Sequence, residues 1–312
     1  MVRRLEVVSR KKYVDHRNWP EYNEQLVVRG KFYLDFSFVK NWDKELERMN
    51  KGKEGAPYKF PDSYIKWLSV WKQWTDYRSL EGISRALAAQ GIIPAFQDYT
   101  ATWNRIHDFI PAIRLPSYKD LNTATDLTCM NPKNGGQYLE FKYGRKGRRK
   151  SIVVVITVDV KHKKLLRVEA YVEGEGPTEP DLGMKQNREL IEKGYDIYKH
   201  NADGKYDNNK TFDFWDKRKT KLAIPPRKNA KIRRTKSKRR KKEIRIFRRL
   251  GFRRWYQVKN YGDRLAAEGE HSGVKRKFGE NLVSRLENSL CAEAIQRFWA
   301  YDMLKDYGVG IV

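Results

Sequence analysis

The chain has 312 residues, and its 66 Lys and Arg against 39 Asp and Glu give a formal net charge of +27 at pH 7. This length holds one large domain or two modest ones with a real core. So large a surplus of positive charge repels itself and is tolerated best beside a polyanion. Nine Trp and eighteen Tyr argue against a disordered basic tail, because aromatic side chains build cores or stack on bases. Composition therefore predicts a folded protein that binds nucleic acid, with a membrane surface as the weaker alternative.

We do not expect a membrane-spanning protein, a secreted protein or a protein stabilised by disulfides. The longest apolar run, residues 152–156, has the length of a strand, and the N-terminus does not resemble a signal peptide. Cys129 and Cys291 are too few for a disulfide framework or a zinc cluster, so we expect two buried free thiols. The five histidines show no metal-ligand spacing. These features predict a cytoplasmic protein, and its charge favours association with the nucleoid.

Residues 1–115 form the first predicted region, which is mostly helical. The pattern over residues 30–50 indicates a short strand that leads into a helix. Apolar residues at helical spacing predict three helices, over residues 64–74, 76–90 and 98–109. Asp98 is placed to cap the last of these, and Gly91 ends the one before it. Two short helices with a Gly-containing turn between them suit a helix-turn-helix within residues 76–110, and an ordinary helical hairpin is the alternative.

Residues 116–312 form the second predicted region, in which strands alternate with helices. The predicted order is strand 121–129, strand 152–160, strand 166–172, helix 178–193, strand 196–201, helix 208–218 and strand 221–224. The second and third strands make a hairpin, because apolar residues alternate along the third. A last helix over residues 281–304 turns Leu282, Leu286 and Leu290 towards the core. The order predicts an α/β fold, a mixed sheet flanked by helices, although periodicity alone does not give the strand order.

The most basic segment, residues 227–254, carries sixteen Lys and Arg side chains against the single acid Glu243. Such a run is usually a solvated face, and a nuclear-localisation tract is another interpretation. Its position just before residues 261–275 favours a third, that it follows a DNA backbone. The residues that we select as DNA contacts in this segment are Arg227, Lys228, Arg239 and Arg240.

Residues 261–275, YGDRLAAEGEHSGVK, carry the clearest chemical pattern. Tyr261, Arg264, Glu268 and Lys275 stand at steps of three, four and seven residues. On one helix these steps place all four side chains within a stripe roughly 60° wide. A helix that only packed would place apolar residues there. The phenol, guanidinium and ammonium suit phosphate oxygens, and the carboxylate suits a divalent metal ion. We interpret the stripe as a phosphoryl-transfer face, with an exposed charged helix as the alternative.

The spacing Y-x2-R-x3-E-x6-K resembles the signature of the DDE transposases of bacterial and archaeal insertion sequences, and most of all their IS-five-type group. Two upstream blocks resemble the same family in the same order. They are KYGRKGRRK at residues 142–150, and NADGKYD at 201–207 with LAIPPRKNA at 222–230. Within residues 76–110, YRSLEGI and DYTATWNRI resemble the segment that precedes the family's catalytic domain. The resemblance covers roughly residues 76–285 and implies an RNase H-like catalytic domain.

By this resemblance, Asp126, Asp203 and Glu268 are the catalytic and metal-binding residues. Carboxylates at strand ends open onto the edge of a sheet, where α/β domains place their sites. Two like charges 4 Å apart repel by about 4 kcal/mol at an effective dielectric of 20, so the trio should take up protons or bind cations. Oxygen ligands favour two Mg²⁺ ions, with Mn²⁺ as a substitute. Tyr261, Arg264 and Lys275 would then contact phosphates at the transposon end.

Three other acids compete for these roles. Glu270 lies two residues beyond Glu268, and the phase of the helix does not separate the two, although the family spacing selects Glu268. Asp159 faces a hairpin turn, which indicates a structural role. Asp207 is placed to cap the helix that follows it.

The implied reaction is metal-dependent cleavage of double-stranded DNA at transposon ends, followed by strand transfer into target DNA, by a homodimer. Three alternatives stay open. The protein could be a nuclease of the same fold without strand transfer, or a chemically silent DNA-binding protein descended from a transposase. It could also be a basic RNA-binding protein, in which case the acids have no chemical role.

Overall fold

The computed structural model describes residues 17–109, 111–133, 141 and 149–310. Most of the block at 142–150 therefore lies outside the described residues. The chain forms two compact units, one from residues 1–35 with 304–312 and one from residues 36–303. These bounds differ from the predicted division at residue 115, which stays a prediction. None of the helices in the described residues has both the length and the apolar character that crossing a bilayer requires.

The smaller unit joins α1 (Trp19–Lys31) to the end of α11 (Glu287–Gly308). Gly308 allows the close approach of the two, because a Cβ at this position would lie 2.7 Å from the carbonyl oxygen of Gln25. The ring of Phe32 meets that of Tyr307 edge-on, with 5.4 Å between centroids. α1 and the last turn of α11 are thereby held together by packing.

Four helices open the larger unit. They are α2 (Trp42–Asn50), α3 (Asp62–Trp71), α4 (Tyr77–Ala89) and α5 (Tyr99–His107). Asp76 caps α4 by accepting a hydrogen bond from the Ser79 amide, and Asp98 caps α5 through the amides of Thr100 and Ala101. The three helices predicted from apolar spacing are therefore confirmed, with bounds shifted by up to three residues.

The strand predicted within residues 30–50 is wrong. Two short 3-10 helices, Phe32–Leu34 and Ser37–Asn41, lead into α2 instead. Aromatic packing explains the difference, because the Phe38 ring lies 5.3 Å from that of Tyr64 and 5.6 Å from that of Trp67. The rings of α3 thus fix the 3-10 helix Ser37–Asn41 in place.

Residues 90–98, nine in all, separate α4 from α5. The turn of a helix-turn-helix is usually about three to four residues long. The length of this connection favours the helical hairpin over the helix-turn-helix.

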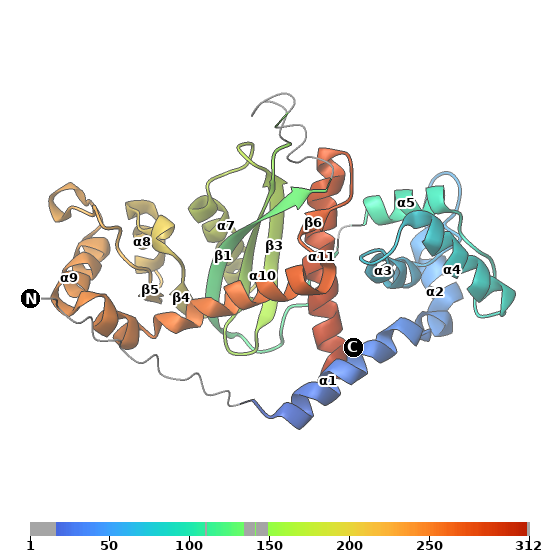
Figure 1. The fold of residues 1–312 in the computed structure, drawn as a ribbon, viewed down its shortest axis with the longest axis horizontal. Coiled ribbons are helices and arrows are strands. Elements are labelled where there is room, and N and C mark those ends of the chain that lie inside the picture. The colour runs from blue at the N-terminus through green and yellow to red at the C-terminus, as the bar shows by residue number, and fades with distance from the viewer. Residues whose placement is uncertain (1–16, 110, 134–140, 142–148, 311–312) are drawn as a thin grey trace, which may run out of the picture. The chain divides into compact units, whose positions relative to one another are not determined.

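A mixed sheet forms the centre of the larger unit (Figure 1). Its strands are β1 (Asp120–Pro132), β2 (Ile152–Asp159), β3 (Lys164–Val172), β4 (Asp196–Asn201), β5 (Lys221–Ala223) and β6 (Asn281–Leu282). The order is β3-β2-β1-β4-β5, and β6 pairs with the end of β1. β1 is antiparallel to β2 and parallel to β4, and β4 is parallel to β5. This order and these directions are those of an RNase H-like sheet, so the predicted fold class is confirmed.

Helices cover both faces of the sheet, and for this reason all eight residues of β2 are buried. Val153 and Val155 pack with Leu182 of α7 (Glu179–Glu192) on one face. Thr125 of β1 points the same way, because Asn187 of α7 donates a hydrogen bond to its hydroxyl at 3.3 Å. The next residue of β1, Asp126, therefore points to the other face, that of α10 (Leu265–Phe278).

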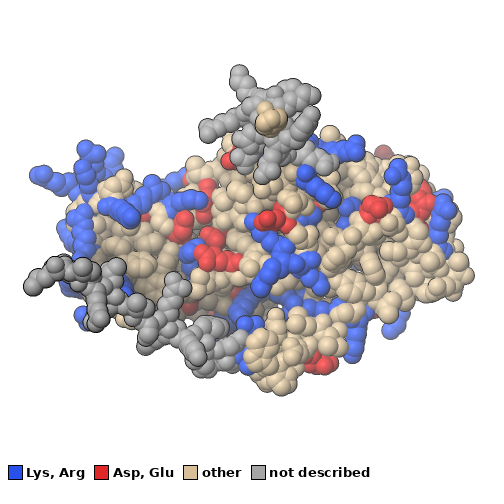
Figure 2. Space-filling view, in the orientation of Figure 1, with Lys and Arg blue, Asp and Glu red and all other residues tan. Residues whose placement is uncertain are grey.

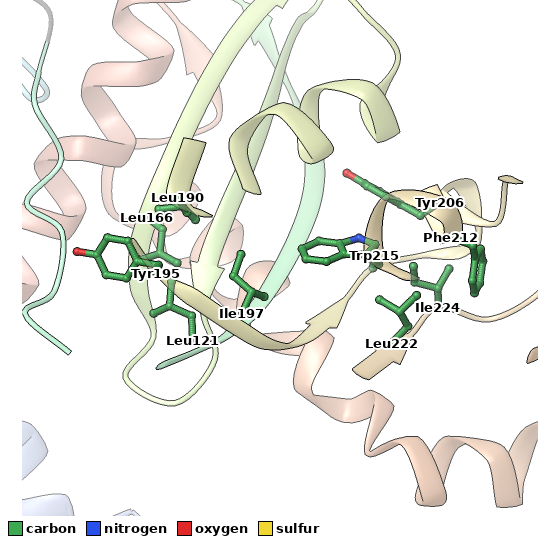
Figure 3. Close-up of a cluster of buried hydrophobic side chains, with 11 residues drawn as sticks. Leu121, Leu166, Leu190, Tyr195, Ile197, Tyr206, Phe212, Trp215, Leu222 and Ile224 are labelled. Carbon is green, nitrogen blue, oxygen red and sulfur yellow. The ribbon is translucent and has the colours of Figure 1, made fainter. Parts of the chain in front are cut away.

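A hydrophobic cluster supports the parallel end of the sheet (Figure 3). It joins β4 and β5 to α8 (Asn209–Asp216), and Phe212 and Trp215 of α8 are fully buried in it. Tyr206, just past β4, is also fully buried and donates a hydrogen bond to the backbone oxygen of Glu179. The loop that follows β4 is thus held against α7.

The last predicted helix begins later than expected. Residues 281–282 form β6, and Leu282 is buried in register with Pro132 of β1. α11 starts only at Glu287, and Leu286, expected in the core, is 64% exposed. A two-residue strand leaves no periodic signal in the sequence, so the apolar spacing extended the helix too far.

Both cysteines are free thiols, as expected, but neither is buried. Cys129 lies in β1 and is exposed, and Cys291 is partly exposed. The expectation of two buried thiols is therefore wrong.

Replacing Gly183 by Ala should destabilise the fold by about 1–3 kcal/mol, because the site has no room for a methyl group. A Cβ there would lie 2.5 Å from the hydroxyl of Tyr206 and 2.9 Å from Cγ2 of Thr125. Urea unfolding measures the change. Gly82→Ala in α4 is the control, because nothing lies within 4 Å of its Cβ, and it should gain up to about 1 kcal/mol. Equal effects of the two substitutions would contradict this packing.

Acid should destabilise the protein through buried histidines. Burial lowers the pKa of His200 to about 3 from its ordinary 6.5, and the ring is stacked on Trp215 and bonded to Thr123. Below about pH 6.5, His200 is protonated in the unfolded chain but stays neutral in the folded chain. The free energy of unfolding therefore falls as pH falls from 6.5 to about 3. The loss reaches up to about 4 kcal/mol for one such histidine.

The measurement is the free energy of unfolding across this pH range for the wild type and His200→Gln. The variant should be less stable near neutrality, yet its stability should fall less steeply with acid. Burial also lowers the pKa of His271 to about 3, so part of the slope remains in the variant. A slope that His200→Gln leaves unchanged would show that His200 titrates alike in both states.

Candidate active site

Two of the predicted acids, Asp126 and Asp203, lie near the end of β4. β1 and β4 run parallel, with Ala124 in register with Asn201. The same register carried on by two residues places Asp126 level with Asp203. Asp203 begins the 3-10 helix Gly204–Tyr206 and accepts a hydrogen bond from the Lys205 amide at 2.7 Å.

The third acid reaches the same place from α10 through Arg264. The Arg264 guanidinium contacts Asp126 at 3.3 Å through Nη1, and its Nη2 is hydrogen-bonded to Glu268. Asp126 and Glu268 therefore share one cation. Glu268 is 42% exposed, whereas Glu270 is buried. The structure thus places Glu268 beside Asp126.

The predicted single helix over residues 261–275 is divided in the structure. α9 (Lys238–Lys259) ends at Asn260 in the left-handed conformation, Tyr261–Arg264 is a 3-10 helix, and α10 follows. Tyr261 nevertheless stays beside Arg264, whose guanidinium lies 5.7 Å from the ring centroid. Burial raises the pKa of Tyr261 to about 12, so its phenol keeps its proton and can donate a hydrogen bond.

The electrostatics of Asp126 link the three acids. Burial raises the pKa of Asp126 to about 6, the Arg264 charge opposes this rise, and the charges of Glu268 and Asp203 add to it. The charges of Glu268 and Asp203 are therefore close enough to Asp126 to raise its pKa. An acid whose ionised form is this costly gains from a further cation.

Carboxylate oxygens are the ligands that Mg²⁺ and Mn²⁺ prefer. The side chains of Asp126, Asp203 and Glu268 are therefore of the right chemical type to bind such an ion. These side chains are not gathered into a metal cage. Within the part of the chain that the structure describes, no three His, Cys, Asp or Glu side chains lie close enough together to hold an ion. Arg264 accounts for this, because it lies between Asp126 and Glu268. Metal binding by the trio requires that this arginine turn away.

Of the four cations selected in residues 227–254, Arg239 and Arg240 are used inside the fold. Arg240 forms a two-point ion pair with Asp207, at 2.7 and 3.0 Å, and Asp207 is fully buried. Arg239 donates a hydrogen bond to the carbonyl oxygen of Thr220. Asp207 is thus an ion-pair partner and not the predicted cap, since Asn208 caps α8.

Arg227 and Lys228 lie differently. Both are exposed, but Arg227 donates hydrogen bonds to the carbonyl oxygens of Gly204 and Lys205, at 2.9 and 2.7 Å. Arg227 therefore braces the loop that carries Asp203. Lys275 of α10 is partly exposed and lies 3.7 Å from Glu280.

Many other cations of the basic segment face solvent. Figure 2 shows Lys and Arg side chains gathered over α9. The exposed ones are Lys231, Arg233, Arg234, Lys236, Lys238, Lys242, Arg245, Arg248, Arg249, Arg253 and Arg254. The helix changes direction at Gly251, whose φ of 70° suits glycine. A basic surface of this kind follows a phosphate backbone without reading its sequence.

Asp159 has the structural role that its position at the turn predicts. It is buried, accepts hydrogen bonds from the Tyr118 hydroxyl and the His162 amide at 3.0 Å, and pairs with the His162 ring.

Two residues beside the trio were not found from the sequence. Glu179 begins α7, and its Oε2 pairs with Lys205 at 3.0 Å. An acid in the first turn of a helix is common, because it complements the helix dipole, so Glu179 gave no signal of its own. Lys205 lies within the block NADGKYD, two residues after Asp203. This short distance along the chain is the signal in the sequence that points to Lys205 as a site residue.

No family model matches the chain. Two solved structures show a weak similarity to it. The cryo-EM structure of the piggyBac transposase synaptic complex with hairpin DNA is 11% identical, covers 92% of this chain and 79% of its own, and has a TM-score of 0.32. The crystal structure of a pre-cleavage Mos1 transpososome is 11% identical in sequence, and the match covers 96% of this chain and 98% of the Mos1 chain. Its TM-score is 0.22. Scores this low do not establish a shared fold, so the RNase H-like assignment rests on strand order and direction.

Proposed function

We propose that the protein is a metal-dependent DNA transposase of the DDE type, which cleaves double-stranded DNA at transposon ends and joins it to target DNA. The observation that supports the proposal is the contact of the Arg264 guanidinium with both Asp126 of β1 and Glu268 of α10. Asp203 follows β4, which runs parallel to β1 beside Asp126. An RNase H-like sheet with this acidic edge, next to a basic surface, suits phosphoryl transfer on a polyanion.

The three carboxylates would hold two Mg²⁺ ions, with Mn²⁺ as a substitute. Such a pair supplies activation of a water or a 3′-hydroxyl and stabilisation of the leaving oxygen. The chain's own groups bind and orient the DNA. Tyr261 can donate to a phosphate oxygen, and Arg264, once it leaves the carboxylates, can bind one in two-point fashion. Lys275 and the exposed cations of α9 neutralise further phosphates.

The remaining parts of the proposal concern assembly. Paired transposon ends need two sites, so we propose a homodimer on DNA, in the cytoplasm at the nucleoid. The IS-five-type group is the one whose spacing the residues Tyr261, Arg264, Glu268 and Lys275 match.

A second candidate is a DNA-binding protein without chemistry. The position of Arg264 between Asp126 and Glu268 favours it, because a paired carboxylate has less need of a metal ion. The two candidates differ in what they do to DNA that carries the sequences flanking the gene. The transposase nicks this DNA with Mg²⁺ and not with EDTA, and then joins the new end to a second duplex. The silent protein binds the same DNA and leaves it intact under both conditions.

A further inference from the structure

Glu179 is a buried acid at the start of α7. Its exposed fraction is 6%, although the first turn of a surface helix usually leaves an acid in water. Its neighbour Thr178 already caps the helix by accepting a hydrogen bond from the Asp181 amide. Capping therefore does not explain why Glu179 is turned inward.

Only one of the two carboxylate oxygens of Glu179 is bonded. Oε2 accepts from Lys205 at 3.0 Å, whereas Oε1 is buried and has no hydrogen-bond partner among the described residues. A buried carboxylate oxygen without a partner costs free energy. The side chain of Lys205 is 60% exposed, so this cation is well hydrated and only weakly compensates the buried acid.

Glu179 belongs electrostatically to the site that holds Asp126 and Asp203. Burial raises the pKa of Glu179, the ion pair with Lys205 opposes the rise, and the charges of Asp203 and Asp126 add to it. The two acids also share a neighbour, because the side chain of Lys205 pairs with Glu179 and its backbone amide donates a hydrogen bond to the Asp203 carboxylate at 2.7 Å. Glu179 approaches from α7, whereas Glu268 approaches from α10.

We propose that Glu179 is a fourth carboxylate of the site and binds a divalent cation together with Asp203. This inference rests on the proposed function. The bare oxygen Oε1 supplies a hard donor, and a bound cation provides the charge that Lys205 supplies incompletely. Glu179 would add a fourth carboxylate to Asp126, Asp203 and Glu268 as an oxygen ligand for the cations.

The test is binding of Mn²⁺ alone to the full chain, followed by calorimetry. Glu179→Gln keeps the shape of the side chain and should raise the dissociation constant for Mn²⁺ at least about tenfold. Glu189→Gln is the matched control, because Glu189 also lies on α7 and pairs with a cation, Arg167, away from the trio. It should leave the dissociation constant unchanged. Urea unfolding of each variant shows that the fold is retained.

Lys205→Met separates a metal ligand from a merely structural acid. If Glu179 binds the cation, Glu179→Gln weakens Mn²⁺ binding, whereas Lys205→Met removes a competing charge and tightens it. If Glu179 serves only its ion pair, Glu179→Gln and Lys205→Met both lower stability and leave Mn²⁺ binding unchanged, and the inference is overturned. Should Asp203→Asn weaken Mn²⁺ binding while Glu179→Gln does not, the proposed function stands and only the fourth ligand fails. A wild type that binds no Mn²⁺ overturns both.

Discussion

Asp126→Asn is expected to abolish DNA cleavage and, at the same time, to stabilise the fold near neutral pH. The cleavage rate should fall by about 10³-fold or more, because the substitution removes a charged oxygen donor from a group that acts as a unit. Stability should rise because Asp126 is ionised at a cost. Burial raises the pKa of Asp126 to about 6, and its side chain is only 14% exposed.

The sign of the pH dependence follows from this raised pKa. Between about pH 4 and pH 6 the folded chain holds a proton on Asp126 that the unfolded chain has lost, so stability falls as pH rises through this window. A shift of about two pKa units corresponds to up to about 3 kcal/mol above pH 6. Asparagine carries no such cost.

Urea unfolding of the wild type and Asp126→Asn near pH 4 and near pH 8 measures the effect. The variant should gain stability near pH 8 and gain little near pH 4. Asp213→Asn on the exposed face of α8 is the control and should change neither value. A variant that is less stable than the wild type at both pH values would show that the Arg264 pair outweighs the burial of Asp126.

Arg240→Met is expected to destabilise the fold by about 3–5 kcal/mol, because it leaves a buried carboxylate without its ion-pair partner. Asp207 is fully buried and meets Arg240 in two contacts. Asp207 also accepts a hydrogen bond from the Arg227 amide, at 2.9 Å. Lys228→Ala, in the same basic segment but exposed, should leave the free energy of unfolding nearly unchanged.

For DNA affinity we expect the opposite: Lys228 contributes to binding, whereas Arg240 does not. Lys228→Ala should weaken binding uniformly across sequences and lower the salt slope by about one, as for one lost phosphate contact. The pair Asp207→Asn with Arg240→Met should recover part of the lost stability, because no buried charge is then left alone. If Arg240→Met unfolds at the same urea concentration as the wild type and instead lowers the salt slope, Arg240 is a DNA contact and the buried pair is unimportant.

The elements with strong periodicity could be predicted from the sequence. The predicted bounds of β2 and β4 agree with the structure to within one residue. Apolar residues continue along β2, and turn residues flank β4. The RNase H-like fold follows mostly from the family resemblance, and periodicity does not give the strand order. β6 and the aromatic segment before α2 were missed, because two residues carry no period and the aromatic rings pack on a helix far along the chain.

The candidate site shows the same division. The family resemblance selects Asp126, Asp203 and Glu268, and the structure places Arg264 in contact with Asp126 and Glu268. Spacing could not show that Arg264 bridges two of them, since that contact joins residues 138 positions apart. Nor could it separate cations that bind DNA from Arg240, whose partner Asp207 lies in another block.

The central claim is that three acids form one catalytic site, and the cleavage rates of single and triple variants test it most directly. Asp126→Asn, Asp203→Asn and Glu268→Gln are measured alone and combined, with Mg²⁺ and DNA from the gene's flanks. Residues that act as a unit lose nearly everything with the first substitution, so the triple variant should be no slower than any single one. Separate losses that multiply in the triple variant, or a single variant that cleaves like the wild type, would contradict the claim.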